Sequence, residues 1–296
     1  MRRCCSKRTA KPRSAMGVDL PRDASPLLLV GAGKMGGAML ERWLEAGLDP
    51  GRATILDPFI ADEHRAGFSD AGVAVAAGAD AVKGPVAVLV LAVKPQSMAE
   101  VLPSVASLAG PQTSIVSVAA GIRLATLEAA FPLGQPVVRV MPNTPAQVGQ
   151  GMSVAVPNSH VSAMQRATID ALFAAVGKVA WTDDEAHIDA VTAISGSGPA
   201  YVFLLAECLA EAGRRAGLPA DLADLLGRQT VTGAGALLGD SPLTPAELRR
   251  NVTSPKGTTA AALDVLMADD GLQLLIARAV NAARKRSVEL HSSSVT

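Results

Sequence analysis

Short apolar runs alternate with segments of helical spacing over roughly the first 180 residues. The runs predict strands near residues 27–31, 53–56, 73–75, 86–92, 114–118, 136–141, 152–157 and 178–182. The segments between them predict helices near residues 34–46, 61–67, 97–107, 123–131 and 160–175. Strands that alternate with helices form mostly parallel sheets with right-handed crossovers. We therefore expect an α/β, Rossmann-like fold for this part of the chain.

The pattern changes near residue 183. From there to about residue 290, Ala- and Leu-rich segments with helical spacing follow one another without a further strand pattern. We therefore predict an α/β domain at residues 26–183 and an all-α domain at residues 184–296. Aromatic residues make up only 3% of the chain, so small aliphatic side chains must build the core, as suits helices packed on a sheet.

Basic and acidic residues balance at 27 each, so no overall field favours nucleic acid or a membrane surface. No segment has the roughly 18 uninterrupted apolar residues that span a bilayer. Six basic residues precede Met16, with no acidic residue among them: Arg2, Arg3, Lys7, Arg8, Lys11 and Arg13. We expect residues 1–25 to form a disordered basic tail. Contact with nucleic acid, organelle targeting and a translation start at Met16 are alternatives for this segment.

The three cysteines and four histidines are scattered along the chain. Their spacing matches neither a disulfide framework nor a zinc site, so we predict no metal site. A reduced, cytoplasmic setting follows as the default expectation.

A glycine-rich turn joins the first predicted strand to the first predicted helix. It contains Gly31, Ala32, Gly33, Lys34, Met35 and Gly36. In such a turn the first glycine permits a tight bend, the second lets a pyrophosphate approach the backbone, and the third lets helix and strand pack closely. The helix N-terminus then offers N–H groups and a partial positive charge to the phosphates. We therefore interpret residues 26–183 as a dinucleotide-binding domain, the alternative being a turn that binds nothing.

Asp57 ends the second predicted strand, 21 positions after Gly36. A carboxylate at this distance accepts hydrogen bonds from the adenosine ribose of NAD and repels a 2′-phosphate. The following residues include Asp62 and Glu63, which also favours NADH. A capping or turn role for Asp57 is the alternative, since Asp-Pro sequences often start turns.

Polar residues emerge where other predicted strands end. The strand near 86–92 leads into Ala92, Val93, Lys94 and Pro95, and the strand near 136–141 leads to Asn143. Ligands of open α/β sheets bind at the carboxyl ends of the strands. We therefore expect these residues to face the cofactor.

The stretches "VKP", "MPNTP", "SGSGPAY" (195–201) and "TSPKGTT" (253–259), in this order, closely resemble pyrroline-5-carboxylate reductases. The resemblance runs from about residue 27 to 290. It implies an NAD(P)H-dependent oxidoreductase that reduces the C=N bond of 1-pyrroline-5-carboxylate to L-proline, the last step of proline synthesis. It also implies that the helical domain dimerises, that active sites form between subunits, and that dimers often assemble into decamers.

The resemblance assigns roles to further residues. Ser254, Gly257, Thr258 and Thr259 would hold the carboxylate of the cyclic imino acid, because a loop entering a helix aims N–H groups at an anion. Thr192 would be catalytic, with its hydroxyl near the imine nitrogen. Plain helix capping and a back-bond within the helix are the alternatives. The family often prefers NADPH whereas Asp57 favours NADH, so the expected cofactor is NADPH or NADH.

Three rival interpretations are weaker or fail. The serines of "SGSGPAY" lack the strand-turn-helix setting of a hydrolase nucleophile. A β-hydroxyacid dehydrogenase would carry a catalytic lysine in its linking helix, and residues 183–216 contain none. A non-catalytic dinucleotide sensor should have lost its substrate loop, yet "TSPKGTT" is intact. Another NAD(P)-dependent imine or carbonyl reductase and the sensor stay as alternatives.

Overall fold

The computed structural model describes residue 20 and residues 24–293, so the predicted basic tail lies almost wholly outside the described residues. The strands are β1 (Leu27–Val30), β2 (Ala53–Leu56), β3 (Ala74–Ala76), β4 (Val86–Leu91), β5 (Ala109–Ser117), β6 (Val137–Met141), β7 (Gly151–Pro157) and β8 (Gly177–Trp181). The helices between them are α1 (Lys34–Glu45), α2 (Asp62–Asp70), α3 (Met98–Val105), α4 (Leu124–Ala130) and α5 (Ala163–Ala174). The predicted alternation of strands and helices is confirmed.

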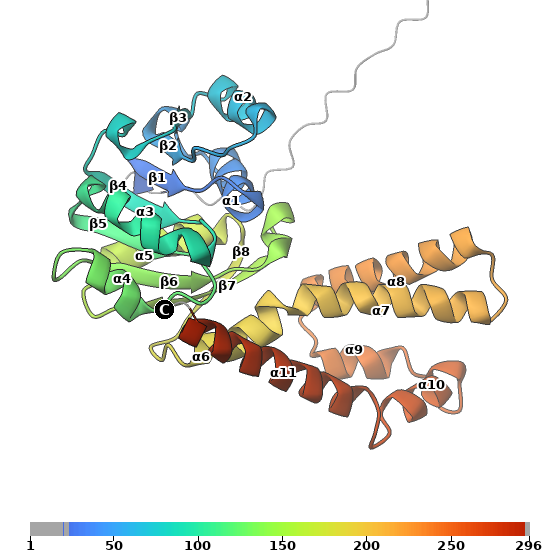
Figure 1. Cartoon of the computed structure of the whole chain (residues 1–296). Helices are drawn as coiled ribbons and strands as arrows, with labels where there is room; N and C mark the ends of the chain where they lie inside the picture. Colours follow the sequence, from blue (N-terminus) through green and yellow to red (C-terminus); the bar gives the residue numbers. More distant parts are fainter. Residues whose placement is uncertain (1–19, 21–23, 294–296) are drawn as a thin grey trace, which may run out of the picture. The chain divides into compact units, whose positions relative to one another are not determined.

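Within the described part of the chain, eight strands form one sheet in the order β3-β2-β1-β4-β5-β6-β7-β8 (Figure 1). Strand β1 lies between β2 and β4 and runs parallel to both, with Leu29 paired to Ile55 and to Val90. The chain therefore adds β2 and β3 on one side of β1, and then returns to add β4 to β8 on the other side. Such a reversal opens a crevice at the carboxyl ends of the central strands.

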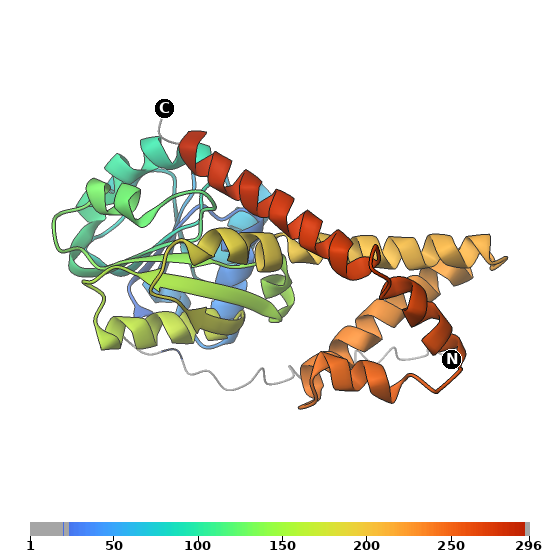
Figure 2. The ribbon, with the colours of Figure 1, turned by 90° about the horizontal axis from the view of Figure 1, so that it is seen from below.

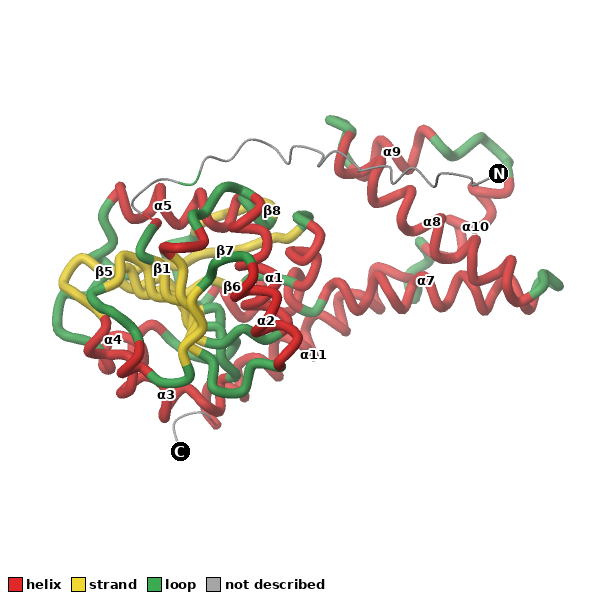
Figure 3. The backbone as a smooth tube through the Cα atoms, turned by 90° about the horizontal axis from the view of Figure 1, so that it is seen from above, coloured by secondary structure: helices red, strands yellow, loops and turns green. Residues whose placement is uncertain are grey.

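Helices cover both faces of this sheet, with α5 on one side and α3 and α4 on the other (Figure 3). Alternate residues of β1 are buried on both faces of the sheet. Leu27 and Leu29 join a core with α1 and α5, whereas Leu28 points to the other face and is equally buried. The indole N–H of Trp43 on α1 donates to the carbonyl of Leu172 on α5 at 2.8 Å, entirely within the core. A strand buried on both faces is apolar throughout, which is the signal that identified these strands in the sequence.

Strand β5 begins at Ala109, five residues before the start predicted at residue 114. Its first half is polar and carries no strand pattern. The hydroxyl of Thr113 accepts the N–H of Gly110 at 2.8 Å and donates to the carbonyl of Val86, beside a shift in the register with β4. Side-chain hydrogen bonds therefore stabilise this extension, and an apolar pattern could not reveal it.

Contacts between residues divide the chain into two compact units. The first contains the sheet. The second contains residues 182–296 together with the loop segments 120–123 and 141–144. Its helices are α6 (His187–Val191), η7 (Thr192–Gly196), α7 (Gly198–Arg215), α8 (Ala220–Asp240), α9 (Pro245–Asn251), α10 (Thr258–Leu266) and α11 (Leu272–Ser293). We call these the sheet unit and the helical unit.

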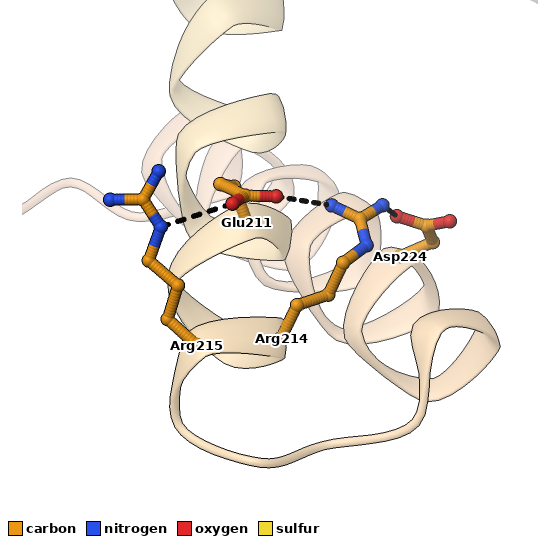
Figure 4. Close-up of polar contacts among 4 residues, drawn as sticks. All are labelled: Glu211, Arg214, Arg215 and Asp224. Carbon is orange, nitrogen blue, oxygen red and sulfur yellow. Dashed lines mark hydrogen bonds and ion pairs between the residues drawn. The ribbon is translucent and has the colours of Figure 1, made fainter.

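Helices α7 and α8 form an antiparallel hairpin in the helical unit (Figure 1). They approach closely at Gly227, where an added Cβ would lie 2.7 Å from the carbonyl oxygen of Ala206. Near the tip, Glu211 accepts hydrogen bonds from Arg215 at 3.0 Å and from Arg214 at 3.2 Å, and Arg214 also pairs with Asp224 (Figure 4). The hydrogen bond from the Arg215 guanidinium, followed by its charge, lowers the pKa of Glu211 from 4.5.

The helical unit leaves many large apolar side chains exposed. Phe203 is 63% exposed, Leu225 61% and Val265 71%, although all three lie on regular helices. Other exposed apolar residues of the unit include Val202, Leu204, Leu205, Leu209, Leu222, Leu226, Leu237, Leu238, Leu266, Leu274, Leu275 and Ile276. An apolar surface of this extent marks an interaction site.

Candidate active site

The turn between β1 and α1 has the geometry of a phosphate-binding loop. Gly31 has φ +90°, a conformation that favours glycine, and its N–H donates to the carbonyl of Leu56 at 3.0 Å. At Gly36 an added Cβ would lie only 2.1 Å from the carbonyl oxygen of Gly31. Both glycines are therefore required by the backbone itself.

The N-terminus of α1 opens at Gly33. This residue is exposed, and an added Cβ there would have no atom within 4 Å. No side chain caps the helix, and its first turn contains no acidic residue. The first turn of the helix therefore supplies no negative charge to its own N-terminus, and there is room beside Gly33 for an anion. This open end of α1 fits the pyrophosphate of a dinucleotide.

The side chain of Asp57 connects the ends of β1 and β2. One carboxylate oxygen accepts the N–H of Ala32 at 2.8 Å, and the other accepts the N–H of Phe59 at 2.9 Å. The second bond closes a local turn, so the turn role suggested by the Asp-Pro sequence is present. The first bond stabilises the glycine-rich turn. Each oxygen keeps a further lone pair, so the half-buried carboxylate can also accept a ribose hydroxyl.

The end of β4 lies directly against this turn. A Cβ at Gly31 would meet Val93 Cγ1 at 2.9 Å and the backbone of Ala92 at 3.0 Å. Lys94 follows, is exposed, and precedes the short helix η4 (Pro95–Ser97). The structure thus brings Gly31–Gly36, Asp57 and residues 92–95 together where the strand order reverses.

In the helical unit, Thr192 begins the π-helical turn η7. Its hydroxyl donates to the carbonyl of Ile188 at 2.7 Å, which is the back-bond considered as the alternative for this residue. The side-chain amide of Asn143 reaches the same turn and donates to the carbonyl and the hydroxyl of Ser195, at 3.1 and 3.2 Å. Asn143 therefore belongs to the helical unit, as Thr192 does, whereas the other predicted cofactor residues belong to the sheet unit.

The loop before α10 carries the predicted carboxylate-binding residues. Gly257 is the N-cap of α10, no side chain caps this helix, and the N–H of Gly257 donates to the carbonyl of Ser254 at 3.0 Å. Thr258 is exposed and Thr259 is half-buried. The helix end is therefore open to an anion, as at α1.

Thr192 and this loop lie toward opposite ends of α11. Ser287 near the C-terminal end of α11 donates to Asp189 of α6 at 2.6 Å, whereas α10 precedes the N-terminal end of α11 (Figures 1 and 2). From Leu272 to Ser287 the helix rises by roughly 22 Å, at 1.5 Å per residue. One small substrate could not touch both sites within one chain.

Comparison with known proteins agrees with this architecture. Residues 185–290 match the family described as pyrroline-5-carboxylate reductase dimerisation, and residues 27–121 match NADP oxidoreductase coenzyme F420-dependent. Pyrroline-5-carboxylate reductase from Pseudomonas aeruginosa is 43% identical over 264 residues, which are 89% of this chain and 96% of that protein. The chain belongs to the pyrroline-5-carboxylate reductase family. The pea (Pisum sativum) reductase is 39% identical over 90% of this chain and 97% of its own length.

Solved structures of this reductase family have the same fold. The Coxiella burnetii enzyme superposes with a TM-score of 0.84 at 32% identity, covering 90% of this chain and 98% of that chain. The Plasmodium falciparum enzyme, solved with NADP bound, gives 0.76 at 27% identity, covering 91% of this chain and 99% of that chain. The chain is thus an NAD(P)H-dependent oxidoreductase of this family, with a Rossmann-like sheet unit and a dimerisation-type helical unit.

Sequence reasoning missed the π-helical turn and the hydrogen bonds that hold it.

Among the described residues, no group of three His, Cys, Asp or Glu side chains is placed to bind a metal ion. The continuous helical stretch from His187 to Arg215 is long and apolar enough to cross a membrane by length and composition alone. This stretch also lies within the region matched by the dimerisation family.

Proposed function

We propose that this protein reduces the C=N bond of 1-pyrroline-5-carboxylate to give L-proline, using NADPH or NADH. The observation that carries the proposal is the similarity to pyrroline-5-carboxylate reductases, which spans both units at up to 43% identity over 89% of the chain. The sheet unit supplies an open phosphate-binding turn, and the helical unit supplies the loop and the hydroxyl that a cyclic imino acid needs.

The cofactor would lie across the crevice between β1 and β4. Gly31, Ala32, Gly33, Lys34, Met35 and Gly36 would hold the pyrophosphate, Asp57 the adenosine ribose, and Ala92, Val93, Lys94 and Pro95 the nicotinamide side. The fit rests on Gly33, since an added Cβ there meets nothing within 4 Å at an uncapped helix end. When bound, the cofactor supplies a hydride.

The substrate carboxylate would bind at the N-terminus of α10, held by Ser254, Gly257, Thr258 and Thr259. Backbone N–H groups and threonine hydroxyls at an uncapped helix end favour an anion. This interaction fixes the one charged group of the substrate and so orients its ring. Orientation of this kind lowers the barrier without any acid or base.

The hydroxyl of Thr192 would contact the substrate nitrogen as a hydrogen-bond acceptor. Its own proton is committed to the carbonyl of Ile188, which leaves two lone pairs on the oxygen. A protonated imine carries an N–H that needs an acceptor. Thr192 therefore favours the iminium form, which is the better electrophile, and it need not transfer a proton.

The helical unit would form a homodimer. Exposed apolar helices are stabilised when another apolar surface buries them, and a second copy of the dimerisation-type region would provide that surface. The separation along α11 gives a second argument, because a site that contains both Thr192 and the α10 loop needs these parts from two subunits. This association also accounts for the apolar stretch 187–215 without a membrane. Assembly into decamers, a cytoplasmic location and a lack of nucleic-acid contact stay predictions.

Steady-state oxidation of NADPH and of NADH with pyrroline-5-carboxylate tests the activity. We expect turnover to proline, and we expect Thr192→Val, which keeps the shape but removes the hydroxyl, to lower kcat by roughly 10². Thr192→Ser, which keeps the hydroxyl, is the matched control and should retain most of the rate. A protein that binds the cofactor yet reduces no pyrroline-5-carboxylate would refute the proposal.

Mixing two inactive variants tests the shared site. Thr192→Val and Ser254→Ala/Thr259→Ala subunits, exchanged in equal amounts, form heterodimers in which one of two sites is intact. We expect recovery of up to about a quarter of the wild-type rate. If the mixture stays as inactive as its components while heterodimers are detected by native mass spectrometry, each site belongs to a single chain.

A further inference from the structure

The helix that carries Thr192 is interrupted by an irregular turn. The N–H of Ser197 donates to the carbonyl of Thr192 at 2.8 Å, a spacing of five residues instead of four. Turns of this π type are rare and frequently lie at functional sites. Here the turn follows Thr192 directly, so the backbone of this residue takes part in it.

The turn leaves two carbonyl groups without their ordinary helical donors. In a regular helix Ala193 would accept from the N–H of Ser197, but that N–H bonds Thr192 instead. Ser195 would accept from residue 199, which is Pro199 and has no N–H. Ala193 is buried and Ser195 is half-buried. A fully buried carbonyl that lacks a donor costs about 1–3 kcal/mol, so other donors stabilise the turn, most of all at Ala193.

Two side chains supply those donors. The hydroxyl of Tyr201, on the first turns of α7, donates to the carbonyl of Ala193 at 3.0 Å. The amide of Asn143, from the loop after β6, donates to the carbonyl of Ser195 at 3.1 Å and contacts its hydroxyl at 3.2 Å. The loop also packs closely here, since an added Cβ at Gly196 would lie 2.5 Å from Met141 Cε.

We infer that Asn143 and Tyr201 are positioning residues, which hold the π-helical turn in the form that presents the hydroxyl of Thr192 to the substrate. The inference rests on the proposed role of Thr192. It differs from the cofactor-facing role that we expect for Asn143 from its place after the strand near residues 136–141. Because the amide must donate to a carbonyl, its Nδ2 atom faces Ser195, and an acceptor in its place would repel that carbonyl.

The direct test compares kcat with cofactor affinity. We expect Asn143→Ala to lower kcat roughly 10- to 100-fold, as a displacement of about 1 Å does, while the Kd for NADPH stays within about twofold of wild type. Asn143→Asp, equal in size but with an acceptor facing Ser195, should lose at least as much. Ser195→Ala is the matched control, and it should lose less because the bond to the backbone carbonyl remains. Tyr201→Phe, which removes only the hydroxyl, should lower kcat several-fold.

A double-mutant cycle separates positioning from a general loss of structure. In a Thr192→Val background, Asn143→Ala and Tyr201→Phe should each change kcat less than about threefold, because the group they position is gone. If Asn143→Ala and Tyr201→Phe lower kcat by the same factors in the Thr192→Val background as in wild type, the inference is overturned. So would a raised Kd for NADPH with kcat preserved, since Asn143 would then act on the cofactor.

Amide hydrogen exchange gives a readout that needs no turnover. Asn143→Ala should speed exchange across residues 192–199 and leave α8 unchanged. If wild type fails to reduce pyrroline-5-carboxylate, the proposed function is wrong, and the exchange result alone decides whether Asn143 holds this turn. If wild type is active and Asn143→Ala changes neither kcat nor exchange, the proposed function stands and the inference is overturned.

Discussion

Two glycines of the β1–α1 turn, Gly33 and Gly36, should respond in opposite ways to the same substitution. Gly36→Ala places a Cβ 2.1 Å from the carbonyl oxygen of Gly31, which is about 1.3 Å closer than an ordinary contact of 3.4 Å. That oxygen belongs to the backbone of a tight turn and cannot rotate away. Gly33→Ala places its Cβ in open space, at φ −68°, which alanine adopts readily.

The expected magnitudes follow from these contacts. Overpacking against a fixed backbone costs about 3 kcal/mol or more, so Gly36→Ala should lower Tm by roughly 5–10 °C. Gly33→Ala costs less than about 1 kcal/mol as a poorer N-cap, or roughly 1–3 °C. Its methyl group, however, occupies the space proposed for the pyrophosphate. Loss of one charge-assisted hydrogen bond, about 1.5–3 kcal/mol, would raise the Kd for the cofactor roughly 10- to 150-fold.

Differential scanning fluorimetry and NADPH titration of the same preparations give both quantities. Gly67→Ala serves as the control, because Gly67 is an exposed position on α2 with no atom within 4 Å of an added Cβ. It should leave cofactor affinity unchanged and raise Tm by roughly 1–4 °C, because alanine favours a helix interior over glycine by about 1 kcal/mol. If Gly33→Ala binds NADPH like wild type, the pyrophosphate does not lie at this helix end, and the proposed cofactor position is wrong.

Three further changes test other parts of the structure. Asp57→Ser should raise the ratio of kcat/KM for NADPH over NADH at least about 10-fold, because the carboxylate would no longer repel a 2′-phosphate. An unchanged ratio in parallel assays would leave Asp57 only its structural bonds to Ala32 and Phe59. Lys256→Gly should raise Tm by roughly 1–3 °C, since Lys256 has φ +59° and glycine relieves that strain; a lower Tm in thermal melts would contradict this. Glu211→Gln should lower Tm at pH 7 but not near pH 3. The pKa of Glu211 is lowered in the fold, so the carboxylate stabilises the folded state above about pH 4.5, and this stabilisation is lost as pH falls through the lowered pKa. An equal change in Tm at both pH values would refute the ion-pair account.

The sequence allowed most of the sheet unit to be predicted, because strands buried on both faces are apolar throughout and the turn after β1 needs glycine. The start of β5 was not predicted, since the hydrogen bonds of Thr113 stabilise it without any apolar pattern. The π-helical turn was not predicted either, because a single five-residue hydrogen-bond spacing does not change the hydrophobic periodicity of the sequence. Pro199 was the one available signal: a proline inside a helical run predicts a carbonyl that needs another donor. That Asn143 supplies the donor depends on tertiary structure.

The scarcity of buried apolar side chains in the helical unit has a consequence for how the protein is made. The sheet unit has its own core and can fold as soon as its residues are available. Among the described residues of the helical unit, the large buried aliphatic side chains are Ile122 and Ile188, and otherwise alanines such as Ala210 and Ala223 are buried. If the proposed homodimer forms, the final packing of this unit waits for an encounter with a second molecule. The rate of that proposed association depends on the square of the local concentration of new chains, so dilute synthesis would delay maturation even when every chain is intact.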